Sequence, residues 1–398
     1  MKKATLKLTA LVLMIGSAVG VFAQTKPINV VTTAVPFLRI SPDARSGGMG
    51  DVGIATSPDA NSSFWNQAKI PFAKSKAAAA VTYTPWLKGL ELNDVYLASL
   101  AGYYKLDDNQ AISGSLRYFS LGNIQFTDAL GNDLNLFRPR EFSIDFGYSR
   151  KLSTKLGIGI ALRYINSNLA GNNNFNGQSY KAGSAVAADL TLFHDGTTTS
   201  TSGSGLNYGL TLTNLGSKIS YTNDATQKDF IPANLGIGVA YTKAFDGDSK
   251  ITFGLDLNKL LVPTPPILST SNGGAGTAAD SAALAKYHNK GVVTSWINSF
   301  GDSPGGFSEE IREVQVSVGA EYMYKDQFAF RAGYFYEDAS KGNRKYFTVG
   351  AGINYNMFGL NFSYLIPSGS GVNRNPLSNT LRFSLLFNLD KSTTMNGK

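Results

Sequence analysis

The chain carries a two-residue rhythm that strongly constrains its fold. Between Lys155 and Tyr164, large apolar residues alternate with glycine, alanine and basic residues. Successive side chains of a β-strand point to opposite faces, so this stretch predicts a strand with one apolar face and one small or polar face. The apolar face ends in a tyrosine. Membrane β-barrel strands have this pattern, with lipid outside, a polar lumen inside and aromatic residues at the interfaces.

The same alternation recurs along the chain and predicts fourteen strands, an even number as expected for a bacterial single-chain barrel. In the second strand the register stays open between Val95 with Leu97 and Tyr96 with Leu100. The predicted strands are 77–84, 94–104, 110–119, 141–150, 155–165, 183–193, 205–214, 233–243, 249–258, 312–323, 328–336, 345–355, 358–366 and 379–388.

The connections and the tyrosines support this count. Connections that follow even-numbered strands are mostly short, and those that follow odd-numbered strands are longer, as periplasmic turns and external loops are in outer-membrane barrels. Tyrosines fall near both strand ends and predict two aromatic girdles. Those at the short turns are Tyr103, Tyr148, Tyr241, Tyr322 and Tyr355, and those at the long loops are Tyr83, Tyr118, Tyr164, Tyr334 and Tyr364. A soluble β-sandwich would not sort tyrosines in this way. We therefore predict an all-β fold, a 14-stranded antiparallel transmembrane β-barrel.

The ends and the composition fit an exported barrel. Lys2 and Lys3 precede an apolar run from Leu8 to Phe22, which is shorter than the roughly 20 residues that span a bilayer and predicts a signal peptide over 1–23. Charged residues make up 16% of the chain, below the roughly 25% of soluble domains. The absence of cysteine excludes disulfides, thiol chemistry and a lipoprotein anchor.

The rhythm divides the exported chain into three parts. Residues 24–76 lack alternation and predict a periplasmic or plug segment of turns and short helices; 77–388 form the barrel, and 389–398 a C-terminal tail. Charges of both signs occur on the lumen-facing positions, where burial requires partners, so we expect ion pairs across the lumen. These residues are Arg117, Asp145, Arg163, Asp189, Asp256, Glu313, Glu321, Arg331 and Arg382.

The longest connection, 259–311, is the second place where the rhythm fails. We expect a helix from Ala278 to about Phe300, with Asp280 as its cap. Loops of this length are usually functional or disordered. Its apolar residues would be exposed outside the cell, which suggests a protein partner. The candidate partner-binding residues are Pro265, Pro266, Ile267, Leu268, Val292, Val293, Trp296 and Ile297.

The sequence carries no convincing motif for catalysis or for cofactor binding. Gly48 to Gly53 matches the bare dinucleotide-binding pattern, but no strand precedes it, so tight packing inside the barrel explains these glycines better. Two distant histidines, His194 and His288, do not suggest a metal site or a catalytic triad. Glu309 and Glu310 are interpreted as solvated loop charges. The basic residues behind the net charge of +8 are scattered. We expect no enzyme activity, no cofactor, no metal and no nucleic-acid partner.

The start of the exported chain resembles the PorV family, outer-membrane proteins of the type IX secretion system in Bacteroidetes. The resemblance rests on the stretch from Phe37 to Asn66, and the wider fold resembles FadL-like barrels with an N-terminal plug. The motif residues expected in the plug are Pro42, Asp43, Arg45, Gly47, Gly48, Met49, Gly50, Asp59, Asn61, Trp65 and Asn66.

The resemblance implies a function in protein secretion. PorV-like proteins bind exported cargo through its C-terminal signal domain and shuttle it from the translocon to the surface attachment complex. The implied partners are the translocon barrel (SprA/Sov-like), cargo C-terminal domains, a sortase-like attachment protein (PorU-like) and outer-membrane lipid.

Two alternatives stay open. One is a FadL-like channel for hydrophobic small molecules. FadL relatives carry Asn-Pro-Ala where this chain has Asn66-Gln67-Ala68, a departure that weakens this alternative. The other is a general porin, against which the predicted plug argues.

Overall fold

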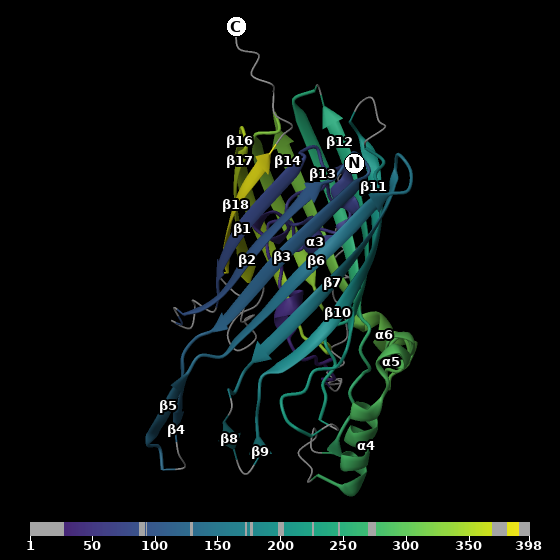
Figure 1. Ribbon diagram of the computed structural model, residues 1–398. Coiled ribbons are helices and arrows are strands. Elements are labelled where there is room, and N and C mark those ends of the chain that lie inside the picture. The colour runs from purple at the N-terminus through teal and green to yellow at the C-terminus, as the bar shows by residue number, and fades with distance from the viewer. Residues whose placement is uncertain are drawn as a thin grey trace, which may run out of the picture.

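The protein is a closed antiparallel β-barrel, described here from a computed structural model (Figure 1). The structure describes residues 28–389 apart from gaps at 87–91, 93, 128–129, 172, 176–177, 198–202, 225–226, 246, 270–275 and 368–379. The predicted signal peptide and all of the tail beyond Leu389 lie outside the described residues.

The wall has fourteen strands, which confirms the predicted fold class. Each strand pairs with its neighbour in the chain, and β1 closes the barrel by pairing with β18 from Ala77↔Leu389 to Tyr83↔Phe383. The wall strands are β1 (Ala77–Pro85), β2 (Val95–Lys105), β3 (Gln110–Leu121), β6 (Arg140–Lys151), β7 (Leu156–Asn168), β10 (Gly183–His194), β11 (Gly205–Gly216), β12 (Asn234–Phe245), β13 (Ser249–Leu260), β14 (Gln315–Tyr324), β15 (Phe328–Tyr336), β16 (Lys345–Tyr355), β17 (Phe358–Pro367) and β18 (Leu381–Leu389).

The alternation of β7 works as its sequence predicts. Ile158, Ile160 and Leu162 are exposed on the outer face, whereas Gly159 and Arg163 are buried toward the lumen. Burying such large side chains in lipid stabilises the folded barrel, while the small lumen-facing residues leave room for the interior. The alternation in the sequence therefore determines which residues of the wall face outward and which face the lumen.

The register of β2 settles the ambiguity left by the sequence. Val95, Leu97 and Tyr103 are buried, and Leu100 and Tyr104 are exposed. The prediction for Tyr103 is therefore wrong, because its side chain faces inward and its hydroxyl donates to the carbonyl of Ser75 at 3.3 Å. Tyr104 takes the outward position at this end of the barrel.

The two ends of the barrel differ in the length of their connections. At the long-loop end lie two small hairpins and a group of helices, which hang below the strands in Figure 1. The hairpins pair β4 (Ile124–Thr127) with β5 (Asp133–Phe137), and β8 (Asn174–Phe175) with β9 (Gln178–Ser179). The helices are α4 (Ala278–Asn289), α5 (Val292–Asn298), α6 (Phe307–Glu310) and the 3₁₀ turn η5 (Ile311–Glu313).

The predicted single helix from Ala278 to Phe300 is divided in two. Lys290 leaves the helical conformation after α4, and Gly291 is the N-cap of α5. The N-cap of α4 is Thr277, and Asp280 is its partner three residues on, in a capping box. The expectation that Asp280 is the cap itself is therefore wrong.

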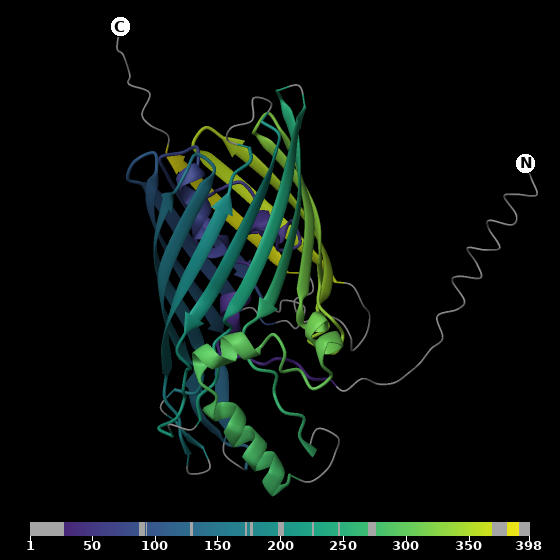
Figure 2. The same ribbon diagram turned by 90° about the vertical axis from the view of Figure 1, so that its right-hand side faces the viewer.

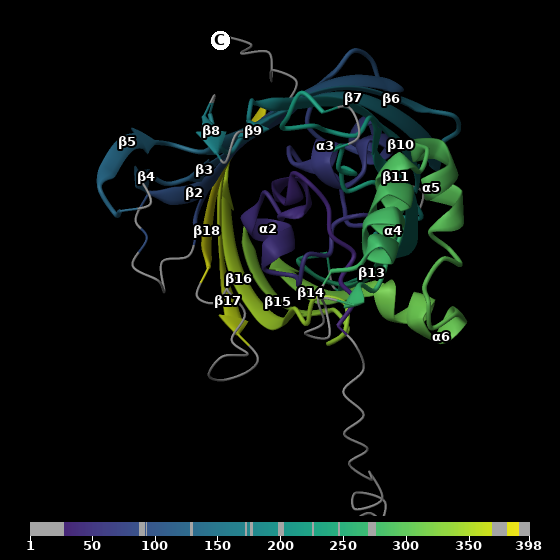
Figure 3. The same ribbon diagram turned by 90° about the horizontal axis from the view of Figure 1, so that it is seen from below.

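The segment before β1 fills the lumen, as the view into the barrel shows (Figure 3). Its short helices are η1 (Pro36–Arg39), α2 (Ala44–Gly47), α3 (Ser62–Trp65) and η2 (Gln67–Phe72). None of the helices in the described part of the chain is long and apolar enough to cross a bilayer.

This segment runs from the long-loop end to the short-turn end. The backbone of Asn29 bonds to Ser340 and that of Ala34 to Phe230, both in long connections, whereas Phe72 packs on Phe193 near the end of β10. The segment is seen between the strands in the side view (Figure 2). We call residues 36–73 the plug.

Candidate functional site

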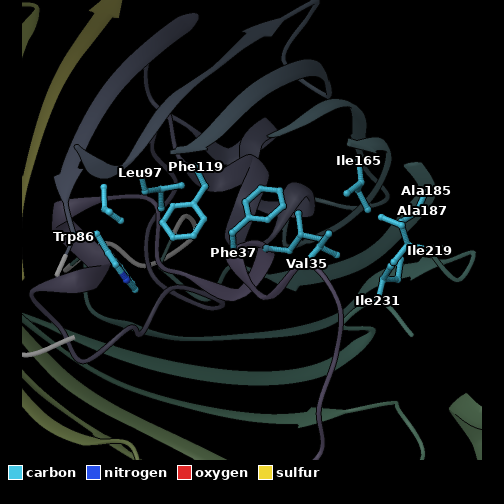
Figure 4. Close-up of a cluster of buried hydrophobic side chains, with 12 residues drawn as sticks. Val35, Phe37, Trp86, Leu97, Phe119, Ile165, Ala185, Ala187, Ile219 and Ile231 are labelled. Carbon is cyan, nitrogen blue, oxygen red and sulfur yellow. The ribbon is translucent and has the colours of Figure 1, made fainter. Parts of the chain in front are cut away.

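A hydrophobic cluster fixes the start of the plug in the long-loop half of the lumen. Val35 and Phe37 pack between Trp86 and Phe119 on one side and Ile165 on the other (Figure 4). The rings of Phe37 and Phe119 are stacked with centroids 6.4 Å apart. All five side chains are buried, so the hydrophobic effect holds this end of the plug to the wall.

Arg45 is the polar centre of the plug. Its guanidinium forms a bidentate ion pair with Glu321 of β14, at 2.9 and 3.0 Å, and binds Asp59 at 3.0 Å. It also donates to the backbone carbonyl and hydroxyl of Ser57. Arg331 of β15 binds the same Glu321 at 2.7 Å. Because all five donors of Arg45 point at these groups, one side chain joins two parts of the plug to the wall.

Asp43 ties the two short α-helices of the plug together. One carboxylate oxygen caps α2 by accepting from the backbone of Ser46 at 2.8 Å. The other accepts from the indole of Trp65 in α3 at 2.7 Å. Pro42, just before it, and Asn61, at the start of α3, are also buried.

The glycines of the motif allow the plug backbone to touch the wall. A Cβ on Gly50, which has φ +70°, would lie 2.6 Å from the backbone nitrogen of Tyr334. A Cβ on Gly48 would lie 3.1 Å from Cα of Gly350. A Cβ on Gly333 of the wall would lie 2.1 Å from the backbone carbonyl carbon of Met49. These contacts agree with packing, and not dinucleotide binding, as the reason for the glycines.

The far end of the plug is held by Asn66. Its amide donates to the carbonyls of Ile54, at 3.1 Å, and Leu192 of β10, at 2.9 Å, while its oxygen accepts from Ala68. Asp256 of β13 accepts from the backbone of Gly53 and Ile54 at 2.7 and 2.9 Å. The motif residues therefore lie together inside the lumen, where they bind the plug to itself and to the wall.

The lumen-facing charges predicted on the strands are buried. Arg163 pairs with Asp145 and with Asp189, the latter at 2.8 Å. The prediction that Glu313 lies on a wall strand is wrong: the strand expected over 312–323 begins at Gln315, and Glu313 lies in η5 before it. The sequence predicts ion pairs across the lumen. The pairs among Asp145, Arg163, Asp189, Glu321 and Arg331 instead join neighbouring strands on the lumen face of the wall.

The long connection after β13 folds against the outside of the wall. Lys259 has the outward register of β13, yet it is buried because Glu310 and Glu313 bind it at 2.9 and 2.6 Å. Lys341, from the connection after β15, binds Glu309 and Glu313 at 2.6 and 2.9 Å. We call these five residues the lysine–glutamate cluster.

The interpretation of Glu309 and Glu310 as solvated charges is therefore wrong. Their partners are Lys259 at the end of β13 and Lys341 in the connection after β15, and sequence spacing does not reveal these contacts. Burial alone would raise the pKa of Glu313, but hydrogen bonds from Lys259 and Lys341 bring it below its usual value. The three glutamates bind α6 and η5 to the barrel.

The candidate partner residues of this connection differ in exposure. Ile267, Val293 and Ile297 are exposed, whereas Pro265, Pro266, Leu268, Val292 and Trp296 are half-buried. The sequence analysis missed Phe300, Phe307 and Ile311, which are also exposed. The spacing of 293, 297 and 300 on one helical face was the signal that could have found the first of them.

These exposed apolar side chains lie on α5 and α6 and in the residues that directly follow each of these helices. We call Val293, Ile297, Phe300, Phe307 and Ile311 the rim face. Ile297 is 70% and Phe307 79% exposed. The two helices lie outside the ring of strands, whereas α4 lies closer to the mouth (Figure 3). Exposed apolar surface of this kind marks interaction sites in folded proteins.

The geometry defines a class of protein: a transmembrane barrel whose lumen is filled by its own N-terminal plug. The family model described as "Type IX secretion system protein PorV" matches residues 23–267. The chain belongs to the PorV family and is an outer-membrane component of the type IX secretion system.

Several solved structures have a similar fold at low sequence identity, among them two toluene transporters and a monoaromatic hydrocarbon channel. The toluene transporter TbuX of Ralstonia pickettii has 10% identity and a TM-score of 0.49, over 88% of this chain and 98% of that one. The monoaromatic hydrocarbon channel CymD has 12% identity and a TM-score of 0.49, over the same shares. The toluene transporter TodX of Pseudomonas putida has 10% identity and a TM-score of 0.47, over 89% and 99%. No curated protein matches the chain.

Proposed function

We propose that the protein binds exported cargo through the C-terminal signal domain of the cargo and carries it from the translocon barrel to the sortase-like attachment protein. The membership in the PorV family supports this function. The long-loop end, which by the rule for outer-membrane barrels faces outward, is the part that would meet these partners.

The observation that carries the proposal is the rim face. The lysine–glutamate cluster holds α6 and η5 to the barrel, so Phe307 and Ile311 are presented on a fixed support. A surface that is already held in its binding conformation loses little conformational entropy when a partner binds. Because the rim face lies beside the wall, we assign it to the contact with a second membrane protein, the translocon barrel. The cargo would then bind over the mouth, near Ile267 and Leu268.

The plug supports a binding role over free diffusion through the lumen. The described plug is hydrogen-bonded to β10, β13, β14, β16 and β18. Passage of a folded or unfolded protein would require all of these contacts to break. Cargo is therefore expected to stay at the outer surface.

The test is a double substitution on the rim face, Val293→Ser with Ile297→Ser, made in the full-length protein. We expect the amount of translocon barrel recovered with the protein from native outer membrane to fall at least fivefold, while the protein stays folded and inserted. Leu130→Ser is the matched control, because Leu130 is 87% exposed in another long connection.

Cargo recovery is measured in the same isolates. Loss of cargo with retained translocon would move the rim face to the cargo contact. Unchanged recovery of both partners, with unchanged secretion, would contradict a binding role for the rim face. Point substitutions are preferable to a deletion of 262–300, because Val262 and Tyr287 pack with Phe230 and Leu260 at the barrel mouth.

A further inference from the structure

A cavity of about 110 Å³ lies between the plug and the wall. It is separate from the rim face. Its lining includes Leu38 and Trp86 of the hydrophobic cluster, so it belongs to the long-loop half of the lumen. The charged side chains that line it are unbalanced: Arg39, Arg163, Arg344 and Arg382 stand against the single carboxylate of Asp51.

Three of these arginines come from different elements, and the two carboxylates beside them leave one positive charge unbalanced. Arg163 is already paired with two aspartates. Arg39 of η1 donates to the amide oxygen of Gln315, and no carboxylate in the described chain pairs with it. Arg344 pairs with Glu337 at 2.8 Å. Burial, with a smaller contribution from the nearby charge of Arg344, lowers the pKa of Arg39 to about 10.

Arg382 of β18 is the most deeply buried of the three. Its side chain is 2% exposed, and its Nη2 lies 4.0 Å from Oδ1 of Asp51. Its Nε and Nη1 have no hydrogen-bond partner in the described chain. The second oxygen of Asp51 is occupied, since Tyr346 donates to it at 2.6 Å. Buried guanidinium donors without partners are costly, and an anion is the ligand that would satisfy them.

We propose that Arg39, Arg344 and Arg382 form a binding site for one oxyanion, a carboxylate or a phosphate group. The planar fork of a guanidinium binds both groups with two parallel hydrogen bonds. The low-dielectric interior strengthens such contacts, and the three arginines outnumber the two carboxylates, Asp51 and Glu337, that face them. The site takes a small anion that enters from the long-loop end.

The structure provides an internal probe for this site. Trp65 and Trp86 line the cavity, and the chain has 3 tryptophans, so a Trp296→Phe background restricts the fluorescence to the two cavity residues. The folded, full-length protein in detergent is titrated with sodium phosphate and, separately, with sodium acetate. Sodium chloride at equal ionic strength gives the reference.

We expect a saturable change in fluorescence that chloride does not produce. Arg382→Gln and Arg39→Gln should each raise the apparent Kd at least tenfold. Arg138→Gln, a change of an exposed arginine in a long connection, should leave the Kd unchanged. If Arg382→Gln fails to fold, Arg39→Gln still tests the site, because Arg39 belongs to the plug and not to the wall.

Each outcome decides something. Saturation by acetate alone assigns a carboxylate, saturation by phosphate alone assigns a phosphate, and saturation by both supports the general oxyanion site. A response equal to that of chloride overturns the proposal. So does a wild-type Kd in both arginine variants.

Discussion

At the scale of single residues, the plug depends on buried charges that have partners on several elements. Arg45 is the clearest case, since Asp59 and Glu321 both bind it. Removing one member of a buried ion pair costs about 3–5 kcal/mol, because the other charge is left uncompensated. We predict that Arg45→Ala loosens the plug without opening the wall, whose ladders do not use this side chain.

The measurement is channel conductance in planar bilayers together with protease cleavage of the plug. Both should increase in Arg45→Ala. Lys250→Ala is the control, because the Lys250–Asp326 pair is partly exposed and such pairs contribute about 1 kcal/mol or less. Equal conductance in the two variants would argue against Arg45 as the polar centre of the plug.

Gly50 is predicted to be irreplaceable for two reasons that can be separated. Alanine at φ +70° is strained, and its Cβ would overlap the backbone of Tyr334 and Val318. Together these effects should destabilise the plug by about 2–4 kcal/mol. Gly247→Ala isolates the strain, since Gly247 has φ +73° and nothing within 4 Å of its Cβ. Thermal unfolding should show a larger loss for Gly50→Ala, and equal losses would contradict the packing argument.

Lys69 makes plug stability depend on pH. Its amino group donates to the carbonyl of Gly53 at 2.6 Å, and burial lowers its pKa from 10.5 to about 8. Between these two values the unfolded chain binds more protons than the folded one, so the free energy of unfolding rises with pH across that window. The unfolding midpoint should rise between pH 8 and pH 10 more in the wild type than in Lys69→Met. Parallel curves would refute this role.

At the scale of elements, the α6–η5 segment is a support whose strength lies in the lysine–glutamate cluster. Lys341→Ala would leave Glu309 without its cation and Glu313 with one of two. We predict faster proteolysis and hydrogen exchange over α5 and α6, while the wall strands keep their protection. Lys325→Ala is the control, because Lys325 forms an exposed pair with Asp248. Unchanged exchange in Lys341→Ala would mean that other contacts hold the segment.

The same scale shows why some elements could be predicted from the sequence and others could not. The wall strands follow a period of two, which is local information, so their positions are confirmed within a few residues. Tyr103 and Tyr104 are adjacent and equally aromatic, so the sequence does not say which one faces out. The burial of Glu309 and Glu310 depends on Lys341 from the connection after β15 and on Lys259 at the end of β13, and no local pattern indicates those contacts.

The plug motif was recognisable, but its contacts were not. Asp43, Arg45 and Asn66 lie close together in the sequence. Glu321, which binds Arg45, and Leu192, which binds Asn66, lie far along the chain. The anion site was missed for the same reason, since Arg39, Arg344 and Arg382 meet only after the barrel closes around η1. The spacing of residues in the sequence does not indicate any of these contacts between distant parts of the chain.

At the scale of the whole molecule, the wall and the plug are separable structures. The backbone ladder between β1 and β18 uses no plug residue, although Ala44 of the plug donates to the Ser384 hydroxyl on the lumen face of β18. We predict that replacing 36–72 by a short flexible linker leaves a closed, heat-resistant barrel whose lumen conducts ions. Electrophoretic mobility before and after heating tests closure, and bilayer recordings test conductance. A variant that fails to close would show that the plug is required for the wall.

The direction in which the N-terminal segment runs has a consequence for assembly. The segment begins beside the long loops at Asn29 and reaches the opposite end of the lumen before β1 starts. Strand β1 then pairs with β18, the last strand of the wall. Threading this segment through a finished cylinder would require the chain to pass the whole filled interior. The simpler order of assembly is that the sheet curls around an N-terminal segment that is already in place and that the β1–β18 seam closes last. The plug would then be in position before the barrel closes.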